Sequence, residues 1–203
     1  MLENQISNPN QLIAEIGRRM AGRWAANAAG GNISLRVGDQ IHISPRFADL
    51  KWGWQLAPEQ IVSGPIADDT LVGTPTFSRE GLAHIAIYRA FPEAQAIIHA
   101  HPFHVMPFAA AAKAIPPIID AATIFGVIEP VPYAMPNTQE LADHVVAGLQ
   151  GKEELMVAFA APVLLPKHGV FVAGKDLYTC LEAVIKVDMN AWCVLAQKLL
   201  PDD

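Results

Sequence analysis

The chain has 203 residues, of which 52% are hydrophobic and 17% charged, and its formal net charge is −6. This length suits one hydrophobic core, and no composition shift or linker marks a second domain, so we expect residues 1–203 to form a single domain. The lack of a Lys/Arg cluster argues against nucleic acid as a partner, and the apolar composition favours a homo-oligomer that buries further surface between subunits.

The N-terminal part of the sequence predicts a helix followed by a β-hairpin. Asn8 as the cap, Pro9 at the first helical position and an apolar stripe at helical spacing predict a helix over residues 9–28, which Gly30-Gly31 ends. The segments "NISLRV" and "QIHIS" alternate apolar and polar residues across Gly38-Asp39, a pattern typical of a hairpin. A loop rich in Trp, Pro and Gly follows.

The middle of the sequence predicts two helices around a buried strand. Ser78 is expected to cap a helix that runs to about Phe91, with Glu80 in its first turn, where the helix dipole favours a carboxylate. The segment "AQAIIHA", residues 94–100, has the β-branched content of a strand. Asn137 and Glu140 have the spacing of a capping box before the helical pattern "LADHVVAGL".

The C-terminal part predicts two strands and a long helix. "APVLLPKHGVFVAG" indicates two buried strands bent at Lys167-His168-Gly169, and an amphipathic pattern runs from Asp176 to Leu200. Because several strands are joined by hairpins rather than by helical crossovers, we expect an α/β fold with a central mixed or mainly antiparallel sheet flanked by helices.

Cysteines and apolar runs indicate the compartment. Cys180 and Cys193 fall 13 residues apart in one predicted helix, too far for a disulfide, which fits a reducing environment. The segment "MLENQISNPN" lacks the pattern of a secretion signal. The longest apolar run, "MVAFAAPVLLP", is about half of the roughly 20 residues that a membrane helix needs. We therefore expect a cytoplasmic protein without a membrane partner.

Histidines are concentrated in "AIIHAHPFHVM", residues 96–106. Because side chains alternate along a strand, His99 and His101 should share one face, with Cα atoms roughly 6.6 Å apart. Zinc prefers a third protein ligand, for which His168 is the natural candidate, and Gly169 allows the sharp turn that would aim its ring inward. The alternative is that His99 and His101 bind no metal and are polar residues whose hydrogen bonds are formed within a core, or that they lie on an exposed strand face.

The remaining histidines are expected to have other roles. His104 lies outside the strand alternation and should support the metal ligands or the fold. His42, His84 and His144 sit at ordinary strand and helix positions and are interpreted as structural, although His84 lies one helical turn from Glu80.

The ordered motifs "GGNISLR", "ISP", "SREGLAHIAIYRAFPEAQAIIHAHP" and "LLPKHGVFVAG" resemble the class II aldolase/adducin family, which includes L-fuculose-phosphate aldolase. The resemblance runs from about residue 9 to residue 200. It implies that His99, His101 and His168 hold Zn²⁺ or another divalent metal and that Glu80 is the acid/base.

The same resemblance implies a substrate pocket and an assembly. By motif position Asn32 and Ser78 would line a phosphate pocket. The family also implies a three-layer α/β/α domain and a homotetramer with active sites at the subunit boundaries.

Two departures from the family pattern affect the substrate. Sugar-phosphate aldolases of the family typically carry Thr-Gly and a second serine where this chain has Arg46, Phe47 and Arg79. Two arginines still suit phosphate or carboxylate, which guanidinium binds bidentately, although each could equally be surface charge. The tyrosines that transfer a proton at the departing aldehyde in the aldolases are missing, since Asp120 follows the H-x-H strand and the chain ends at "LLPDD".

These features predict a metal-dependent lyase. It would cleave a carbon–carbon bond in an anionic hydroxy-carbonyl compound, by default a phosphorylated sugar or sugar acid, with the metal stabilising an enediolate. Decarboxylation, dehydration and epimerisation on the same metal centre remain open, because they would tolerate the loss of the tyrosines. A non-catalytic scaffold of the adducin type is the alternative from a different class.

Overall fold

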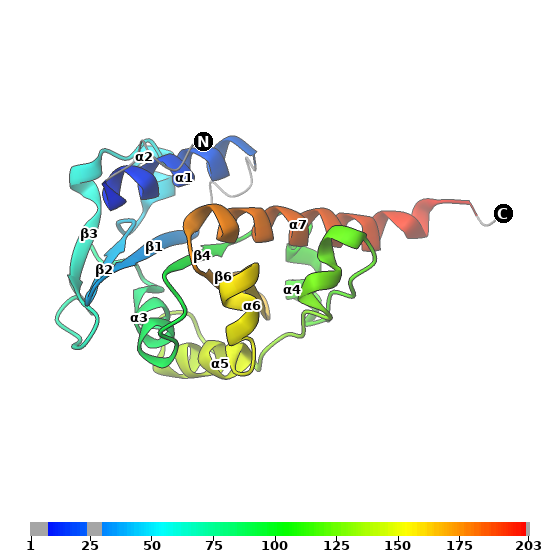
Figure 1. Ribbon diagram of the computed structural model, residues 1–203. Helices are drawn as coiled ribbons and strands as arrows, with labels where there is room; N and C mark the ends of the chain where they lie inside the picture. The colour runs from blue at the N-terminus through cyan, green and yellow to red at the C-terminus, as the bar shows by residue number, and fades with distance from the viewer. Residues whose placement is uncertain (1–7, 24–29, 202–203) are drawn as a thin grey trace.

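The computed structural model describes residues 8–23 and 30–201 (Figure 1). The strands are β1 Asn32–Val37, β2 Gln40–Ile43, β3 Val62–Pro65, β4 Ala96–Ala100, β5 Ala161–Leu165 and β6 Gly169–Gly174. The helices are α1 Pro9–Arg23, α2 Ala48–Trp52, α3 Gly81–Ala90, α4 Met106–Ala111, α5 Gln139–Leu149, α6 Glu153–Ala158 and α7 Leu177–Ala196. Short 3₁₀ turns are η2 Pro58–Gln60, η3 Asp120–Phe125 and η4 Gln197–Leu199.

The six strands of the described residues form one sheet in the order β3-β2-β1-β4-β6-β5, and every neighbouring pair is antiparallel. This confirms the expected mainly antiparallel α/β architecture. The histidine-bearing strand β4 is central, with Asn32 of β1 opposite His99 on one side and Phe171 of β6 opposite it on the other.

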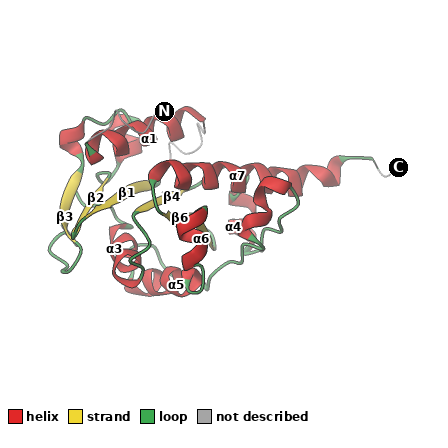
Figure 2. Cartoon of the chain, viewed as in Figure 1, coloured by secondary structure: helices red, strands yellow, loops and turns green. Residues whose placement is uncertain are grey.

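Helices cover both faces of the sheet, as Figure 2 shows, and each face has its own apolar core. On one face Ile98 and Ala100 of β4 pack with residues of α1 and α7. On the other face Ile97 packs with residues of α3, α5 and α6. Strand alternation therefore turns His99 toward the α3 side, because it follows Ile97 by two residues.

The first helix begins as expected, with Asn8 Oδ1 accepting the Asn10 backbone N–H at 2.9 Å. Its predicted end at residue 28 lies outside the described residues, which leave a gap at 24–29. The long C-terminal helix is confirmed as α7, where the Asp176 carboxylate caps the helix by accepting the Thr179 N–H at 2.7 Å. Cys180 and Cys193 are both free thiols.

Two predicted helix caps were wrong. α3 begins at Gly81, so Glu80 occupies the cap position and Ser78 instead closes a turn, its carbonyl accepting the Gly81 N–H. In α5 the cap is Thr138, whose hydroxyl accepts the Leu141 N–H at 3.1 Å. Asn137 lies just before it in the left-handed region, at φ 65°, and cannot serve as the cap. The observed cap of α3 lies two residues after the predicted one, and that of α5 lies one residue after it.

The Trp-, Pro- and Gly-rich loop contains elements that the sequence pattern did not predict. Its strand β3 reads Val-Ser-Gly-Pro, which lacks alternation and contains a proline, and it lies at the sheet edge, where proline is tolerated. α2 follows the hairpin, and Trp54 beyond it is fully buried in the α1 and α7 core. Within the described residues, no helix is both long and apolar enough to cross a membrane.

Candidate metal centre and active site

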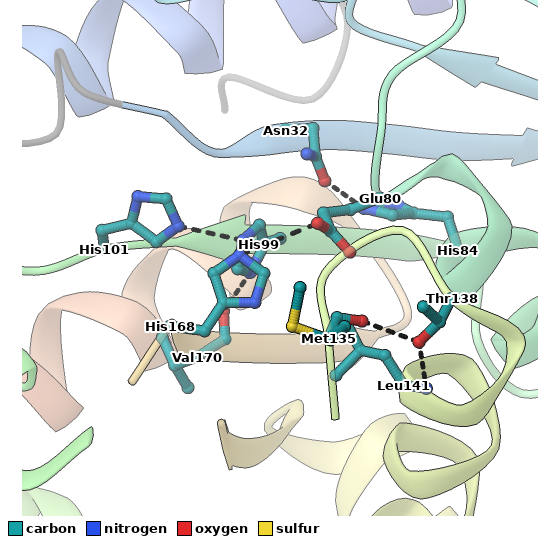
Figure 3. A network of polar contacts seen from close by, with 10 residues as sticks. All are labelled: Asn32, Glu80, His84, His99, His101, Met135, Thr138, Leu141, His168 and Val170. Carbon is teal, nitrogen blue, oxygen red and sulfur yellow. Dashed lines mark hydrogen bonds and ion pairs between the residues drawn. The ribbon is translucent and has the colours of Figure 1, made fainter. Parts of the chain in front are cut away.

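The three candidate ligands come together at one end of the central strands. His99 lies near the end of β4, His101 follows directly, and His168 lies in the turn that joins β5 to β6. The Nε2 atoms of His99 and His101 are 3.1 Å apart, and the His168 ring centroid lies 4.7 Å from that of His99. One ligand atom from each of the three side chains lies within 4.8 Å of the others. The sequence prediction of convergence is therefore met (Figure 3).

The hydrogen bond of His99 determines which of its nitrogens is available. His99 Nδ1 donates to the Val170 carbonyl at 3.1 Å, so Nε2 carries a lone pair toward the other two rings. Burial lowers the pKa of His99 well below its usual value, and the neighbouring His168 and His101 lower it further. The imidazole is therefore neutral, as a metal ligand must be.

The other two rings are neutral as well. Burial lowers the pKa of His101, against an opposing effect of the Asp49 carboxylate. Burial also lowers the pKa of His168 to about 4, helped by His101 and Arg79. His168 Nδ1 is buried and has no hydrogen-bond partner among the described residues. Three neutral imidazoles crowded together fit a divalent cation, and a nitrogen-only ligand set suits zinc among the first-row metals.

Glycines let the backbone approach the histidines closely. A Cβ on Gly30 would lie 2.6 Å from the His101 ring, and one on Gly31 would lie 2.8 Å from the His99 carbonyl. Both residues have positive φ angles, 144° and 99°. The "GG" pair therefore does more than follow the first helix, because a larger residue at either position would push against the ligand strand.

Glu80 lies beside the cluster, with Oε1 3.8 Å from His168 Nε2 and only 6% of the residue exposed. Burial raises the pKa of Glu80 to about 7, while the Asn137 backbone N–H and the Arg79 guanidinium act in the opposite direction. A carboxyl group that titrates near neutrality can both accept and return a proton at physiological pH. The geometry thus supplies a group suited to acid/base chemistry next to the candidate ligands.

A cavity of about 410 Å³ opens onto the cluster. All the site residues expected from the sequence line it, namely Asn32, Arg46, Ser78, Arg79, Glu80, His99, His101 and His168. A second cavity of about 320 Å³ shares Arg46, Ser78 and Arg79 with the first. These three residues therefore stand between two adjoining spaces.

Phe47 organises the two arginines. The guanidinium carbon of Arg46 lies 4.8 Å from the Phe47 ring centroid, and that of Arg79 lies 5.6 Å from it. Phe47 itself has φ 64°, an uncommon conformation for a bulky residue. Neither arginine forms an ion pair with a carboxylate within the described chain, and Arg46 Nε is buried without a hydrogen-bond partner there. Two guanidinium groups that form no ion pair in the described residues thus line the cavity, which suits an anionic ligand.

Asp49 also lines the cavity and was missed by the sequence reasoning. It lies in the first turn of α2, a helix that the sequence pattern did not predict, so no signal connected it with His101. Its carboxylate counters the effect of burial on the pKa of His101.

The histidines outside the cluster contact other parts of the fold. The Asp188 carboxylate contacts His104 twice: Oδ1 accepts the His104 backbone N–H at 2.8 Å, and Oδ2 lies 2.9 Å from Nδ1 of the ring. These contacts attach the segment after His101 to α7. His42 Nδ1 lies 2.8 Å from Asn10 Oδ1, and His144 Nδ1 lies 3.0 Å from the Pro132 carbonyl. These contacts agree with structural roles.

None of the three tyrosines of the chain, all of which lie in the described residues, lines either cavity. Tyr88 is buried in α3, and Tyr133 and Tyr178 are exposed. Asp120, the residue found where the family resemblance implies a tyrosine, is exposed at the start of η3 and lines neither cavity.

A helix-flanked antiparallel sheet that presents three histidines and a buried glutamate to one cavity defines the chain as an α/β protein with a candidate metal centre. Residues 11–195 match the family model described as Class II Aldolase and Adducin N-terminal domain, and the chain belongs to this family.

The similar proteins include enzymes with different reactions. A 3-oxo-tetronate 4-phosphate decarboxylase of Haemophilus influenzae is 28% identical over 89% of this chain and 84% of its own length. An L-fuculose phosphate aldolase of Methanococcus maripaludis is 27% identical over 86% of this chain and 88% of its own length. A solved L-fuculose 1-phosphate aldolase superposes with a TM-score of 0.81 at 23% identity, covering 98% of this chain and 92% of that one.

Proposed function

We propose that this chain is a metal-dependent lyase that breaks a carbon–carbon bond in an anionic hydroxy-carbonyl compound. His99, His101 and His168 hold the metal, zinc in the first instance, and Glu80 moves the proton. The observation that carries the proposal is the convergence of three neutral imidazoles next to a buried carboxyl group with a pKa of about 7. The family membership and the named relatives, an aldolase and a decarboxylase, support it.

The roles of the residues follow from the charges that such a reaction creates. Breaking a bond beside a carbonyl leaves negative charge that needs a sink, and a zinc ion would supply a Lewis acid for it. A proton must leave the hydroxyl group at the cleaved bond, and one must reach the carbon left behind. Among the described residues, Glu80 is the carboxyl group next to the histidines whose pKa is raised toward neutrality, so we assign it this exchange.

The anionic end of the substrate is assigned to the arginine side of the cavity. Arg46 and Arg79 supply the positive charge, and Asn32 and Ser78 add neutral polar groups in the same cavity. The decarboxylase and the aldolase described above are both named after phosphorylated compounds. A phosphorylated sugar or sugar acid is therefore the substrate class that we propose.

Decarboxylation is the second candidate reaction. It also breaks a carbon–carbon bond and leaves the same kind of negative charge, but the leaving group is carbon dioxide, which departs from a carboxylate without any proton transfer. The lack of a tyrosine in either cavity favours it over aldol cleavage, where the hydroxyl group that becomes the aldehyde must lose its proton. Dehydration and epimerisation would use the same residues.

A non-catalytic scaffold is disfavoured by the site itself. Burying three imidazoles and a carboxyl group in one place costs stability, because these polar groups lose their hydration there. The cost is offset when they bind a ligand such as a metal ion. A scaffold would have no reason to keep this arrangement.

The proposal extends to assembly and location. We propose a single domain over residues 1–203, a homotetramer and a cytoplasmic location. Exposed apolar side chains on α7 and beyond, among them Met189, Trp192 and Leu199, support burial against other copies.

Product analysis tests the reaction class. Purified protein is incubated with a panel of phosphorylated and carboxylated hydroxy-ketones. Four signals are followed separately: aldehyde release for aldol cleavage, carbon dioxide for decarboxylation, loss of water for dehydration, and inversion of configuration at a carbon atom for epimerisation. Glu80→Gln should abolish turnover while the protein keeps its metal, and Arg46→Ala or Arg79→Ala should raise KM for anionic substrates. Full activity of Glu80→Gln, or indifference of both arginine variants, contradicts the assigned roles.

A further inference from the structure

A chain of buried hydrogen bonds reaches the cavity from behind Asn32. Tyr88 Oη lies 2.8 Å from Ser34 Oγ, and Ser34 Oγ lies 2.7 Å from His84 Nδ1. His84 Nε2 lies 2.5 Å from Asn32 Oδ1 (Figure 3). None of the four residues is more than 5% exposed. Of the four, only Asn32 lines the cavity, so this row of hydrogen bonds reaches a ligand through Asn32.

The donor and acceptor roles along this row of hydrogen bonds can be assigned in one way only. Ser34 Oγ is the single hydrogen-bond partner of the Tyr88 hydroxyl among the described residues, so Tyr88 must donate to it or bury an unpaired O–H. Ser34 then donates to His84 Nδ1. A neutral imidazole that accepts at Nδ1 carries its hydrogen on Nε2, and therefore donates to Asn32 Oδ1.

The donor-to-acceptor direction of these hydrogen bonds fixes the orientation of the Asn32 amide. Because Oδ1 accepts from His84, the Nδ2 group is the remaining polar end of the side chain, and Figure 3 shows it on the side away from His84. Asn32 shares the cavity with Arg46 and Arg79, so an amide donor joins two positive charges there. Burial lowers the pKa of His84 to about 3, which keeps the ring neutral and the direction unchanged.

We propose that His84 is a positioning residue, which holds Asn32 so that its Nδ2 group donates to the anion of the substrate. The inference rests on the proposed function, in which Asn32 binds that anion. Without the His84 donor the amide is free to turn over and present Oδ1, which repels an anion. Glu80 caps α3 and His84 lies four residues further along it, so one helix end positions both the proton-transfer group and the residue that orients the anion donor.

A double-mutant cycle tests the inference with inorganic phosphate as the probe. The dissociation constant is measured by calorimetry on the purified full chain for wild type, His84→Leu, Asn32→Ala, the double variant and His84→Gln. His84→Leu and Asn32→Ala should each weaken phosphate binding about tenfold, as expected for one hydrogen bond to an anion. The double variant should bind no more weakly than Asn32→Ala. His84→Gln, which keeps an N–H donor near the Nε2 position, should bind within about threefold of wild type.

A merely structural role of His84 would give a different pattern. If His84→Leu weakens binding by the same factor in the Asn32→Ala background, or leaves it unchanged while Arg46→Ala abolishes it, the positioning role is refuted and the anion site stands. If the wild-type protein does not bind phosphate, the anion site fails and the positioning role fails with it.

A measurement on the wild-type protein covers the case in which His84→Leu does not fold. Nitrogen-15 NMR of the histidine rings should show the Nε2–H form for His84, unchanged between pH 5 and pH 8. An Nδ1–H form, or titration within this range, overturns the assigned direction.

Discussion

Replacing Glu80 with Gln is expected to stabilise the metal-free protein at alkaline pH while it removes activity. In the folded chain burial raises the pKa of Glu80 to about 7 from an ordinary value of 4.5. Below pH 4.5 the carboxyl group is protonated in both the folded and the unfolded states, so it costs nothing. As the pH rises from 4.5 to 7, the unfolded state ionises first, and the folded state loses stability.

The size of this loss follows from the two pKa values. At about 1.4 kcal/mol per pKa unit, the full effect above pH 7 is about 3 kcal/mol, and a small part of it is already present at pH 5. Gln keeps the shape and can still accept the Asn137 N–H, but it does not ionise. The stability difference between Glu80→Gln and wild type should therefore grow by about 2 to 3 kcal/mol between pH 5 and pH 8.

Urea unfolding of the metal-free proteins at the two pH values measures the difference, and other titrating groups cancel because both proteins share them. Glu129→Gln is the matched control, since Glu129 is an exposed carboxylate, and its difference from wild type should not change with pH by a comparable amount. A pH-independent difference for Glu80→Gln would refute the conclusion that burial raises the pKa of this carboxyl group.

Three further predictions concern the fold around the site. Gly169→Ala should destabilise the chain by more than Gly151→Ala, because both residues have positive φ but only a Cβ at 169 would lie 2.4 Å from the Ala100 carbonyl; urea unfolding measures both, and equal losses would contradict the close contact. Thr138→Ala should cost about 1 kcal/mol in the same assay through loss of the α5 cap, and no measurable loss would argue against the cap. An exposed-thiol reagent should modify at most one cysteine per folded chain, because Cys180 is fully buried and burial raises its thiol pKa, whereas both should react in denaturant; rapid labelling of two thiols in the native protein would contradict this.

The sequence predicted the parts of the fold that repeat a regular pattern. The hairpin of β1 and β2, the β-branched strand β4, which is buried on both faces, and the long helix α7 each follow a regular pattern, and their positions are confirmed. The strand β3 was missed because an edge strand with one hydrogen-bonded neighbour needs no alternation. The caps of α3 and α5 were misplaced because left-handed and turn conformations, such as that of Asn137, depend on contacts that neighbouring residues in the sequence do not reveal.

The sequence predicted those parts of the candidate site whose residues follow a recognisable spacing, and it missed residues that only the fold brings to the cavity. The H-x-H pair and the bend at His168 indicated a shared ion from strand geometry alone, and the family resemblance added Glu80, Asn32 and Ser78. The roles of Asp49 and Phe47 depend on α2, whose position only the folded chain reveals. His84 was interpreted as structural, since no sequence pattern could show that its ring contacts Asn32.

Metal content tests the central claim most directly. Wild type, His99→Ala, His101→Ala and His168→Ala are purified in the presence of zinc and analysed by elemental mass spectrometry, with His144→Ala as the control because that ring contacts Pro132 outside the cavity. Wild type and His144→Ala should contain about one zinc ion per chain, and each of the other three variants should contain close to none. A wild-type protein free of zinc, or a His99→Ala variant that keeps it, would contradict the account of three histidines holding one ion.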